Sequence, residues 1–267
     1  MTDSAGADPV RVIRNGAILE VTLDRPKANA IDCATSHRMG EVFAAFRDDP
    51  ALRVAILTGG GDRFFSAGWD LNEAAEVGSE GYTGDYGQGG LYGFPELPGL
   101  EKPVICAVNG LAVGGGFEVV LLADMVVAAD SARFWLPETT LGIMPDVGTF
   151  LLPRILPPVI ANEVLYGGRR LDAAEAERWG LVNAVVPGAG LMDAARELAG
   201  RVLRSAPLAV AGVRTTAREA RQLSLAECYA TMRQGGFPAM QRAIRSEDAA
   251  EGPRAMLEKR APLWTGR

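Results

Sequence analysis

Short apolar segments alternate with amphipathic ones over the first two thirds of the chain, and this alternation constrains the fold more than any other feature. Residues 34–47 combine apolar side chains at helical spacing with a polar opposite side, which predicts a helix. Strands are predicted at residues 10–13, 18–23, 52–57, 103–108, 125–129 and 133–136. Strands that alternate with helices are typical of right-handed βαβ crossovers, so the sequence predicts an α/β core.

The pattern changes after Pro145, where helical segments dominate. Helices are predicted at residues 162–167, 173–179, 191–204, 209–223 and 224–233, with one strand at 181–186. The length of 267 residues fits one large domain or two small ones, and no repeat is visible in the sequence. A second, mostly helical region is therefore expected toward the C-terminus.

Histidine is almost absent, since His37 is the single copy, and only three cysteines are present. A zinc site that needs several His and Cys ligands is therefore excluded. A Ser-His-Asp or Cys-His catalytic unit would depend entirely on His37, and no G-x-S-x-G motif accompanies it. Carboxylates are the side chains that remain for acid–base chemistry.

The net charge of −6 and the isoelectric point near 5.0 exclude a global basic field that would attract nucleic acid. The N-terminal residues lack the apolar run of a signal peptide, and the two most apolar stretches, 104–113 and 119–129, are too short for a membrane span. Three separated cysteines form no disulfide framework, which fits a reducing compartment. A soluble cytoplasmic protein without nucleic-acid or membrane partners is therefore expected.

A glycine-rich junction, residues 109–118, separates a buried strand from an apolar helix. The unpaired N–H groups and the dipole of a helix N-terminus suit an anion that develops during a reaction. The spacing G-x-x-x-G-G-G matches neither a dinucleotide-binding fingerprint nor a P-loop. Close packing of the strand on the helix is the alternative interpretation. A second turn with small residues, Ala67-Gly68, is also able to present a backbone N–H group.

Two glutamates lie in apolar surroundings. Glu118 is in the first turn of the predicted helix, and Glu138 follows the strand at 133–136. Such carboxyls are costly unless they are paired or used in chemistry. The structural alternatives are a complement to the helix dipole for Glu118 and a helix cap or surface acid for Glu138. Two carboxyls with two N–H groups for an oxyanion indicate chemistry alpha to a carbonyl through an enolate-like state.

These motifs resemble those of the crotonase (enoyl-CoA hydratase/isomerase) family over nearly the whole chain, from about Val12 onward. The matching segments are Ala67-Gly68-Trp69-Asp70, Val108-Asn109-Gly110, Gly114-Gly115-Gly116-Phe117-Glu118, Pro137-Glu138 and Leu141-Gly142. The resemblance implies an α/β fold, a spiral of ββα units with a C-terminal helical trimerisation region. Residues 1–200 would form the core with the coenzyme A site, and residues 201–267 the oligomerisation region of a homotrimer or a dimer of trimers.

The resemblance also implies a role for each matching residue. Glu118 and Glu138 would be the catalytic acids, and the N–H groups of Trp69 and Gly115 would form the oxyanion hole. No metal and no separate cofactor is implied, because coenzyme A is part of the acyl-CoA substrate. The residues expected to bind coenzyme A are Lys27, Ala28, Ala30, Ala67, Asp70, Leu71 and Lys259. The chain departs from the family at Asn72, where hydratases often have lysine, and at residues 145–149, where many have paired glycines.

One subgroup of the family, whose substrate carries a trimethylammonium group, is most similar to this chain. The similar segments are residues 25–32, 64–71, 156–158 and 246–260. Aromatic faces and acids bind such a cation, and the candidates are Trp69, Tyr82, Tyr86, Tyr92 and Asp146. The tyrosines lie in residues 78–97, a glycine-rich segment that is either a surface loop or a wall or lid of the site. Packing within the loop or contact with an acyl chain is the alternative role of each tyrosine.

Addition or removal of water across the α,β bond of a CoA thioester is therefore the predicted activity. A generic short-chain enoyl-CoA hydratase and a Δ3,Δ2-enoyl-CoA isomerase are the alternatives within enzymes. An isomerase needs only one acid, so the pair of glutamates counts against it. A trimeric scaffold that has lost activity is a further alternative, against which the intact Glu118, Glu138 and Gly115 argue.

Overall fold

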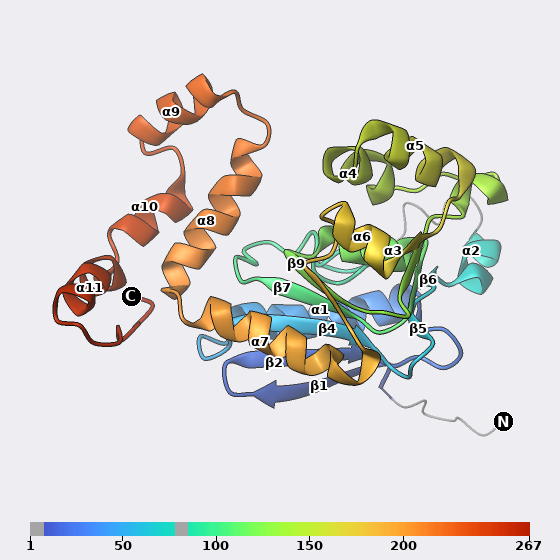
Figure 1. The fold of residues 1–267 in the computed structure, drawn as a ribbon, viewed down its shortest axis with the longest axis horizontal. Helices are drawn as coiled ribbons and strands as arrows, with labels where there is room; N and C mark the ends of the chain where they lie inside the picture. The colour runs from blue at the N-terminus through green and yellow to red at the C-terminus, as the bar shows by residue number, and fades with distance from the viewer. Residues whose placement is uncertain (1–7, 78–84) are drawn as a thin grey trace. The chain divides into compact units, whose positions relative to one another are not determined.

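The computed structural model describes residues 8–77 and 85–267 (Figure 1). The chain forms two compact units, which comprise Met1–Leu100 with Val104–Glu197 and Glu101–Pro103 with Leu198–Arg267. Within the described ranges, no helix is long and apolar enough to cross a membrane. The predicted division of roles, with an oligomerisation region from residue 201, stays a prediction.

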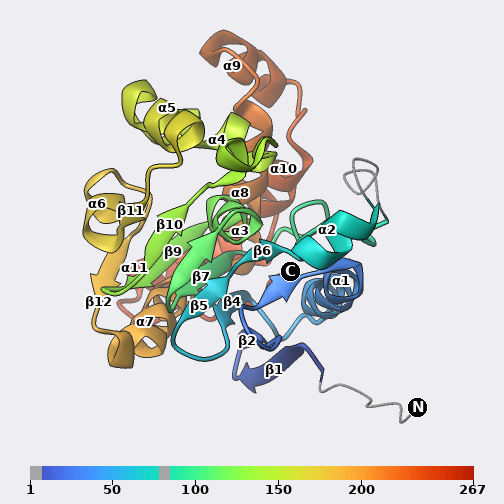
Figure 2. The same cartoon turned by 90° about the vertical axis from the view of Figure 1, so that its right-hand side faces the viewer.

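Six strands form the main sheet of the first unit in the order β1-β2-β4-β7-β9-β12 (Figure 2). β1 and β2 form an antiparallel hairpin that turns at Gly16, and each later strand runs parallel to its neighbour. The bounds are Val10–Asn15 (β1), Ile18–Leu23 (β2), Val54–Gly59 (β4), Val104–Val108 (β7), Met125–Ala129 (β9) and Ala184–Val186 (β12). The strands predicted from apolar segments are confirmed, although β12 is shorter than predicted.

A smaller sheet has the order β11-β10-β8-β5, and β3 pairs with β6 in a separate two-stranded ladder. The bounds are Ala30–Ile31 (β3), Phe64–Ser66 (β5), Gly68–Trp69 (β6), Leu111–Val113 (β8), Arg133–Trp135 (β10) and Leu171–Asp172 (β11). β4, β7 and β9 are each followed by a strand of the smaller sheet and then by a helical segment, with β6 inserted between β5 and α2 in the first case. The ββα unit implied by the family resemblance therefore recurs along the chain without a visible sequence repeat.

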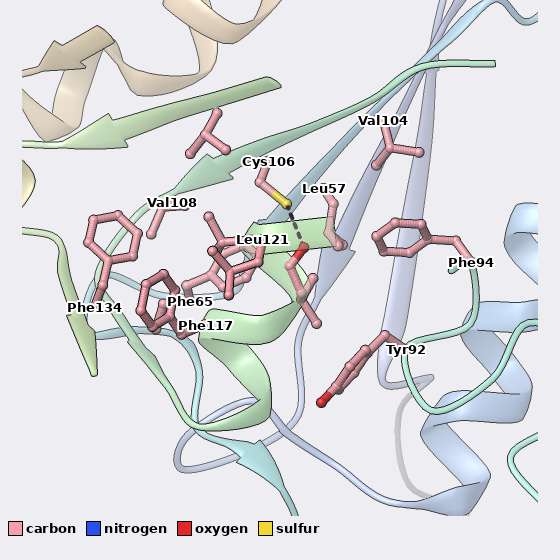
Figure 3. Close-up of a cluster of buried hydrophobic side chains, with 14 of the residues drawn as sticks. Leu57, Phe65, Tyr92, Phe94, Val104, Cys106, Val108, Phe117, Leu121 and Phe134 are labelled. Carbon is pink, nitrogen blue, oxygen red and sulfur yellow. Dashed lines mark hydrogen bonds between the residues drawn. The ribbon is translucent and has the colours of Figure 1, made fainter. Parts of the chain in front are cut away.

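The first unit has one continuous hydrophobic core around helix α1 (Cys33–Asp48) and the strands of the main sheet. The side chain of Asp32 accepts the N–H of Thr35 and begins α1, because this oxygen satisfies one of the amides left unpaired at a helix start. Phe43 is fully buried, and the centroid of its ring lies 4.9 Å from that of Phe94. Phe94 belongs to the cluster of buried hydrophobic side chains in Figure 3. The helix predicted at residues 34–47 is confirmed.

The other helices of the first unit lie mainly after β8. Their bounds are Leu71–Val77 (α2), Gly115–Leu122 (α3), Glu138–Leu141 (η2), Val147–Ile155 (α4), Pro158–Gly167 (α5), Ala173–Arg178 (α6) and Gly188–Gly190 (η3), followed by Leu191–Leu203 (α7), within which the unit ends. α5, α6 and α7 confirm predicted helices. α2 and α4 were not predicted, since α2 is short and α4 contains Pro153.

The second unit is helical. After the end of α7 it contains Pro207–Ala220 (α8), Leu225–Arg233 (α9), Pro238–Ile244 (α10) and Glu247–Leu257 (α11). α8 and α10 pack closely at Gly212, where an added Cβ would lie 3.0 Å from the Cβ of Ala243. The C-terminal residues fold back on α11, because the carboxylate of Asp248 accepts the N–H groups of Thr265 and Gly266.

Candidate active site

A cavity of about 600 Å³ opens in the first unit among α3, η2, α4 and the segment 86–96. It brings together many of the residues predicted from the sequence. Those that line it are Ala67, Trp69, Leu71, Tyr86, Tyr92, Gly115, Glu118, Glu138 and Asp146. Tyr82 lies outside the described residues. Lys259 lies in the second unit, just after α11.

The two segments predicted to bind coenzyme A lie side by side. The N–H of Ala67 donates to the carbonyl of Ala28 at 2.9 Å, and Ala30 pairs with Gly68 in the β3–β6 ladder. Lys27 is exposed in the turn before this ladder and has a φ of +77°. The turn and the 67–71 segment therefore form one continuous edge beside the cavity, and their contact with coenzyme A stays a prediction.

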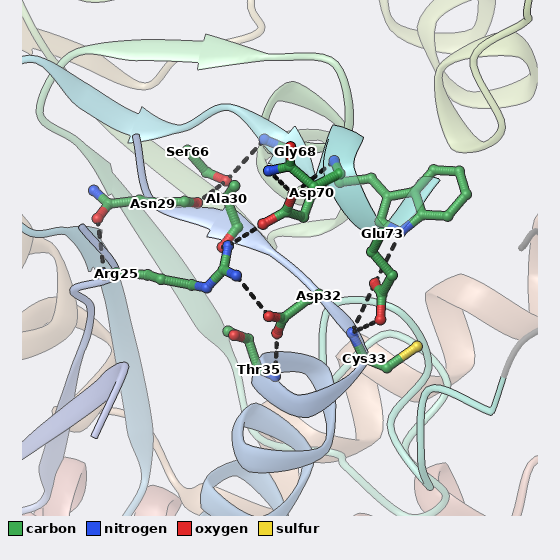
Figure 4. Close-up of polar contacts among 12 residues, drawn as sticks. Arg25, Asn29, Ala30, Asp32, Cys33, Thr35, Ser66, Gly68, Asp70 and Glu73 are labelled. Atoms are coloured by element: carbon green, nitrogen blue, oxygen red, sulfur yellow. Dashed lines mark hydrogen bonds and ion pairs between the residues drawn. The ribbon is translucent and has the colours of Figure 1, made fainter. Parts of the chain in front are cut away.

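Asp70 holds this edge in place instead of lining the cavity (Figure 4). Its carboxylate accepts a hydrogen bond from Arg25 at 2.5 Å and one from the N–H of Asn72 at 2.9 Å, and Arg25 also binds Asp32 at 2.7 Å. Burial raises the pKa of Asp70, but the donors from Arg25 and Asn72 outweigh burial and hold this pKa below its usual value. Asp70 thus contributes to the site by fixing the backbone, and the predicted direct contact with coenzyme A remains a prediction.

The two predicted oxyanion donors come from segments in close contact. Gly68 has a φ of +80°, and a Cβ there would lie only 2.5 Å from the backbone nitrogen of Gly115. Glycine is therefore required at this position, both for the left-handed backbone and for the approach of β6 to α3. Gly115 is the first residue of α3, so its N–H has no acceptor within the helix. Trp69 and Gly115 thus come from adjacent segments and both line the cavity, and their role as oxyanion donors stays a prediction.

Glu118 enters the cavity from the first turn of α3 and is 3% exposed. Its Oε2 accepts the hydroxyl of Tyr92 at 2.7 Å, and its Oε1 accepts the N–H of Gly148 at 2.9 Å. Burial raises the pKa of Glu118, and these two donors oppose the rise because they stabilise the ionised form. Glu118 is therefore a buried carboxyl in which each oxygen accepts a hydrogen bond from the protein.

Glu138 faces the same cavity from the start of η2 and is 9% exposed. Its buried Oε2 has no hydrogen-bond partner among the described residues. Burial is the main cause that raises its pKa to about 7, and the nearby Glu118 and Asp146 add to the rise. Gly114 leaves room for this side chain, since a Cβ there would lie 2.9 Å from Oε1 of Glu138. Near neutral pH, Glu138 is thus able to hold a proton.

The charge of the cavity wall is one-sided. Glu96 and Asp146 line it in addition to the two glutamates, and none of its described lining residues is Lys, Arg or His. Burial raises the pKa of Asp146 as well. Aromatic rings from Trp69, Tyr86, Tyr92, Trp135 and Phe150 complete the wall. The cavity is therefore acidic and aromatic, which suits a cationic group.

Several features of this site were not predicted from the sequence. They are the hydroxyl of Tyr92 on Glu118, the N–H of Gly148, and Glu96 in the lining. A backbone donor leaves no signal in residue type, and Glu96 lies in a segment without periodicity. No group of three or more His, Cys, Asp or Glu residues in the described part of the chain is arranged to hold a metal ion.

Comparisons with known proteins agree with this geometry. The sequence matches the model of the enoyl-CoA hydratase/isomerase family over residues 13–267. It is 55% identical over 262 residues to a carnitinyl-CoA dehydratase of Citrobacter koseri. This alignment covers 98% of this chain and 100% of the relative. A carnitinyl-CoA dehydratase of Proteus mirabilis is 57% identical over 253 residues, with 94% of this chain and 96% of the relative covered.

Solved structures show the same fold. The crystal structure of an enoyl-CoA hydratase from Mycobacterium tuberculosis superposes with a TM-score of 0.88 at 36% sequence identity, and covers 98% of this chain and 100% of that chain. The structure of an enoyl-CoA hydratase from Bacillus anthracis superposes with a TM-score of 0.87 at 33% identity. The superposition covers 97% of this chain and 100% of that chain. The predicted spiral fold is confirmed.

Proposed function

Because the chain belongs to the enoyl-CoA hydratase/isomerase family, we propose that it is a hydro-lyase that adds or removes water across the α,β bond of a CoA thioester. The substrate pair we propose is carnitinyl-CoA and crotonobetainyl-CoA, whose acyl group carries a trimethylammonium. The observation that carries the proposal is the pair of buried carboxyls, Glu118 and Glu138, in one cavity beside the amide of Gly115.

The backbone amides of Trp69 and Gly115 bind the thioester oxygen in this proposal. As the enolate-like state forms, negative charge grows on that oxygen, and donors fixed in advance stabilise it without reorganisation. Loss of one such donor typically costs about 2.7–4 kcal/mol of transition-state stabilisation. The helix dipole of α3 contributes in the same direction, because its N-terminus points at the developing charge.

The two glutamates divide the proton transfers. In hydration, Glu118 as carboxylate takes a proton from water, whose oxygen attacks Cβ, and Glu138 in its acid form gives a proton to Cα. In dehydration, Glu138 takes the Cα proton and Glu118 protonates the leaving hydroxyl. The donors on Glu118 and the raised pKa of Glu138 support this assignment. An isomerase reaction would need only one of these acids.

The acidic and aromatic lining supports the cationic acyl group. A trimethylammonium has no N–H and forms no hydrogen bond, so aromatic faces and diffuse negative charge are its favourable surroundings. Asp146, Glu96 and Tyr86 line the cavity without a lysine or arginine among its described lining residues. The two carnitinyl-CoA dehydratase relatives at 55% and 57% identity support the same substrate.

A panel of enoyl-CoA thioesters tests the proposal, read by the loss of enoyl thioester absorbance. We expect hydration of crotonobetainyl-CoA with a higher kcat/KM than that of crotonyl-CoA. Glu118→Gln and Glu138→Gln each reduce the rate at least a hundredfold, because each removes one proton-transfer group. Glu197→Gln, an exposed position on α7, is the matched control and retains activity. Wild-type rates in both site variants would contradict the assignment.

We further propose a homotrimer or a dimer of trimers in the cytoplasm. Large apolar side chains are exposed on the second unit and need a cover in water, for example Val213, Leu225, Met256 and Leu257. The three cysteines are free, which is compatible with a reducing compartment. Light scattering tests the assembly by a mass three or six times that of the 28.2 kDa chain.

A further inference from the structure

Tyr92 lies at the border between the hydrophobic core and the cavity. Its ring belongs to the buried core cluster, and the side chain is 3% exposed. Figure 3 shows the hydroxyl pointing away from the aliphatic side chains of the core. This hydroxyl donates to Oε2 of Glu118 at 2.7 Å. The absence of a side chain at Gly115 makes room for the hydroxyl of Tyr92, since a Cβ at position 115 would lie 2.6 Å from the hydroxyl oxygen.

The two glutamates differ sharply in their donors. Tyr92 donates to one oxygen of Glu118 and Gly148 to the other, and the backbone of Asp146 also stabilises the ionised form. Glu138 has a buried oxygen with no partner in the described part of the chain. A donor stabilises a carboxylate, and an unpartnered buried oxygen disfavours it. Since like charges in one cavity disfavour double ionisation, the pair holds one proton over part of the pH range, and the donors decide which glutamate carries it.

We propose that Tyr92 is a positioning residue that holds Glu118 in its carboxylate form and thereby leaves the shared proton on Glu138. The hydroxyl acts together with the N–H of Gly148 and does not need to touch the substrate. The proposal rests on the proposed function for its catalytic meaning, because it explains which glutamate is the base and which is the acid. Its structural part, the effect of Tyr92 on the ionisation of Glu118, is measurable in the resting protein.

The other charged groups around Glu118 do not replace this role. Glu138 and Asp146 line the same cavity. The charge of Asp146 raises the pKa of Glu118, whereas the backbone N–H of Asp146 lowers it. The strands β5, β6 and β8, which pack on α3, carry no titratable side chain, and the single charged residue of α4 is Arg154 in its last turn. The hydrogen bond from Tyr92 lowers the pKa of Glu118. Burial and the charge of Glu118 raise the pKa of Tyr92 well above its usual value, so the phenol remains a donor.

Tyr92→Phe tests the proposal with the whole protein. A hydrogen bond to a charged group is worth about 1.5–3 kcal/mol, so we expect the pKa of Glu118 to rise by about one unit or more. The direct readout is the ¹³C carboxyl shift of Glu118, assigned by its loss in Glu118→Gln. In kinetics, kcat for hydration falls about tenfold and KM changes less than twofold. The acidic limb of the pH profile moves to higher pH by as many units as the pKa of Glu118 rises.

Two further variants separate this role from a general structural one. Tyr166→Phe removes the same hydroxyl group from a side chain that is 72% exposed on α5, and it leaves both readouts unchanged. Incorporation of 3-fluorotyrosine at position 92 keeps the ring and makes the phenol a stronger donor. It therefore lowers the pKa of Glu118, and this result remains decisive if Tyr92→Phe unfolds.

An unchanged carboxyl titration in Tyr92→Phe or in the fluorotyrosine protein overturns the proposal. So does a loss of activity without a shift of the acidic limb, because a merely structural contact would act on every pH equally. Failure of the proposed function has a different signature. In that case the wild-type protein converts no thioester of the panel, while the ¹³C titration of Glu118 still decides whether Tyr92 controls its charge.

Discussion

Glu138 makes folding stability depend on pH, and Glu138→Gln removes this dependence. In the folded protein its pKa is raised by burial from 4.5 to about 7. A group whose pKa is raised by folding stabilises the protein when the pH is below its pKa in the unfolded state. This contribution is lost as the pH rises through its pKa in the folded state. The wild-type protein therefore loses stability between about pH 4.5 and 7, because an ionised carboxyl has to remain in the cavity.

The magnitude follows from the same shift. One pKa unit corresponds to 1.36 kcal/mol, so the full change amounts to about 3 kcal/mol above pH 7. The carboxyl borders an open cavity, and solvent screening reduces this to about 2 kcal/mol. Glutamine has nearly the same shape and no charge, so Glu138→Gln gains this amount at pH 8.5 and little at pH 4.5. At this chain length, 2 kcal/mol corresponds to about 4–8 °C in the midpoint of thermal unfolding.

The assay is equilibrium urea unfolding, followed by tryptophan fluorescence at pH 5, 7 and 8.5, with thermal midpoints as a second measure. Glu197→Gln on the exposed side of α7 is the control, and its stability should follow the wild type at all three values. A difference between Glu138→Gln and wild type that is the same at pH 5 and 8.5 would refute the reasoning. It would mean that burial does not raise the pKa of this carboxyl.

Two other perturbations act on the backbone around the site. Gly68→Ala places a Cβ at a φ of +80° and against the nitrogen of Gly115, so hydration kcat should fall at least tenfold and the unfolding midpoint should drop in thermal scans. Arg25→Gln leaves Asp70 without its cation and costs about 1–2 kcal/mol near pH 7 in urea unfolding. Since the pKa of Asp70 is lowered in the folded state, this cost should shrink as the pH falls below 4.

The main sheet could be predicted from the sequence because its strands are continuous apolar segments, and α1 because its buried face recurs at helical spacing. β5 and β8 could not, since three residues are too few for a periodic signal. The pairing of β8 with β5 on one side and β10 on the other is set by tertiary contacts and by close approaches, such as Gly110 against the backbone of Arg63.

The glutamates were predictable because a carboxyl in an apolar stretch stands out by its cost. The environments of the two glutamates could not be predicted. Tyr92 is separated from Glu118 by 26 residues, and nothing in either segment indicates that they meet. The loop around Tyr92 contributes a wall of the cavity, which agrees with one of the two interpretations of residues 78–97, although part of that segment lies outside the described ranges. The sequence thus identifies the two carboxyls, and the fold determines how their environments differ.

The scarcity of histidine now has a physical consequence for pH dependence. His37 donates from Nε2 to the backbone carbonyl of Asp85 and does not line the cavity, so in the proposed mechanism the proton transfers depend on two residues of one type. In that mechanism, hydration needs Glu118 ionised and Glu138 protonated, and dehydration needs Glu118 protonated and Glu138 ionised. Both directions therefore require the singly protonated pair, and they share one bell-shaped pH window. The burial of Glu138, with a pKa of about 7, sets its upper edge, and the donors on Glu118 extend its lower edge.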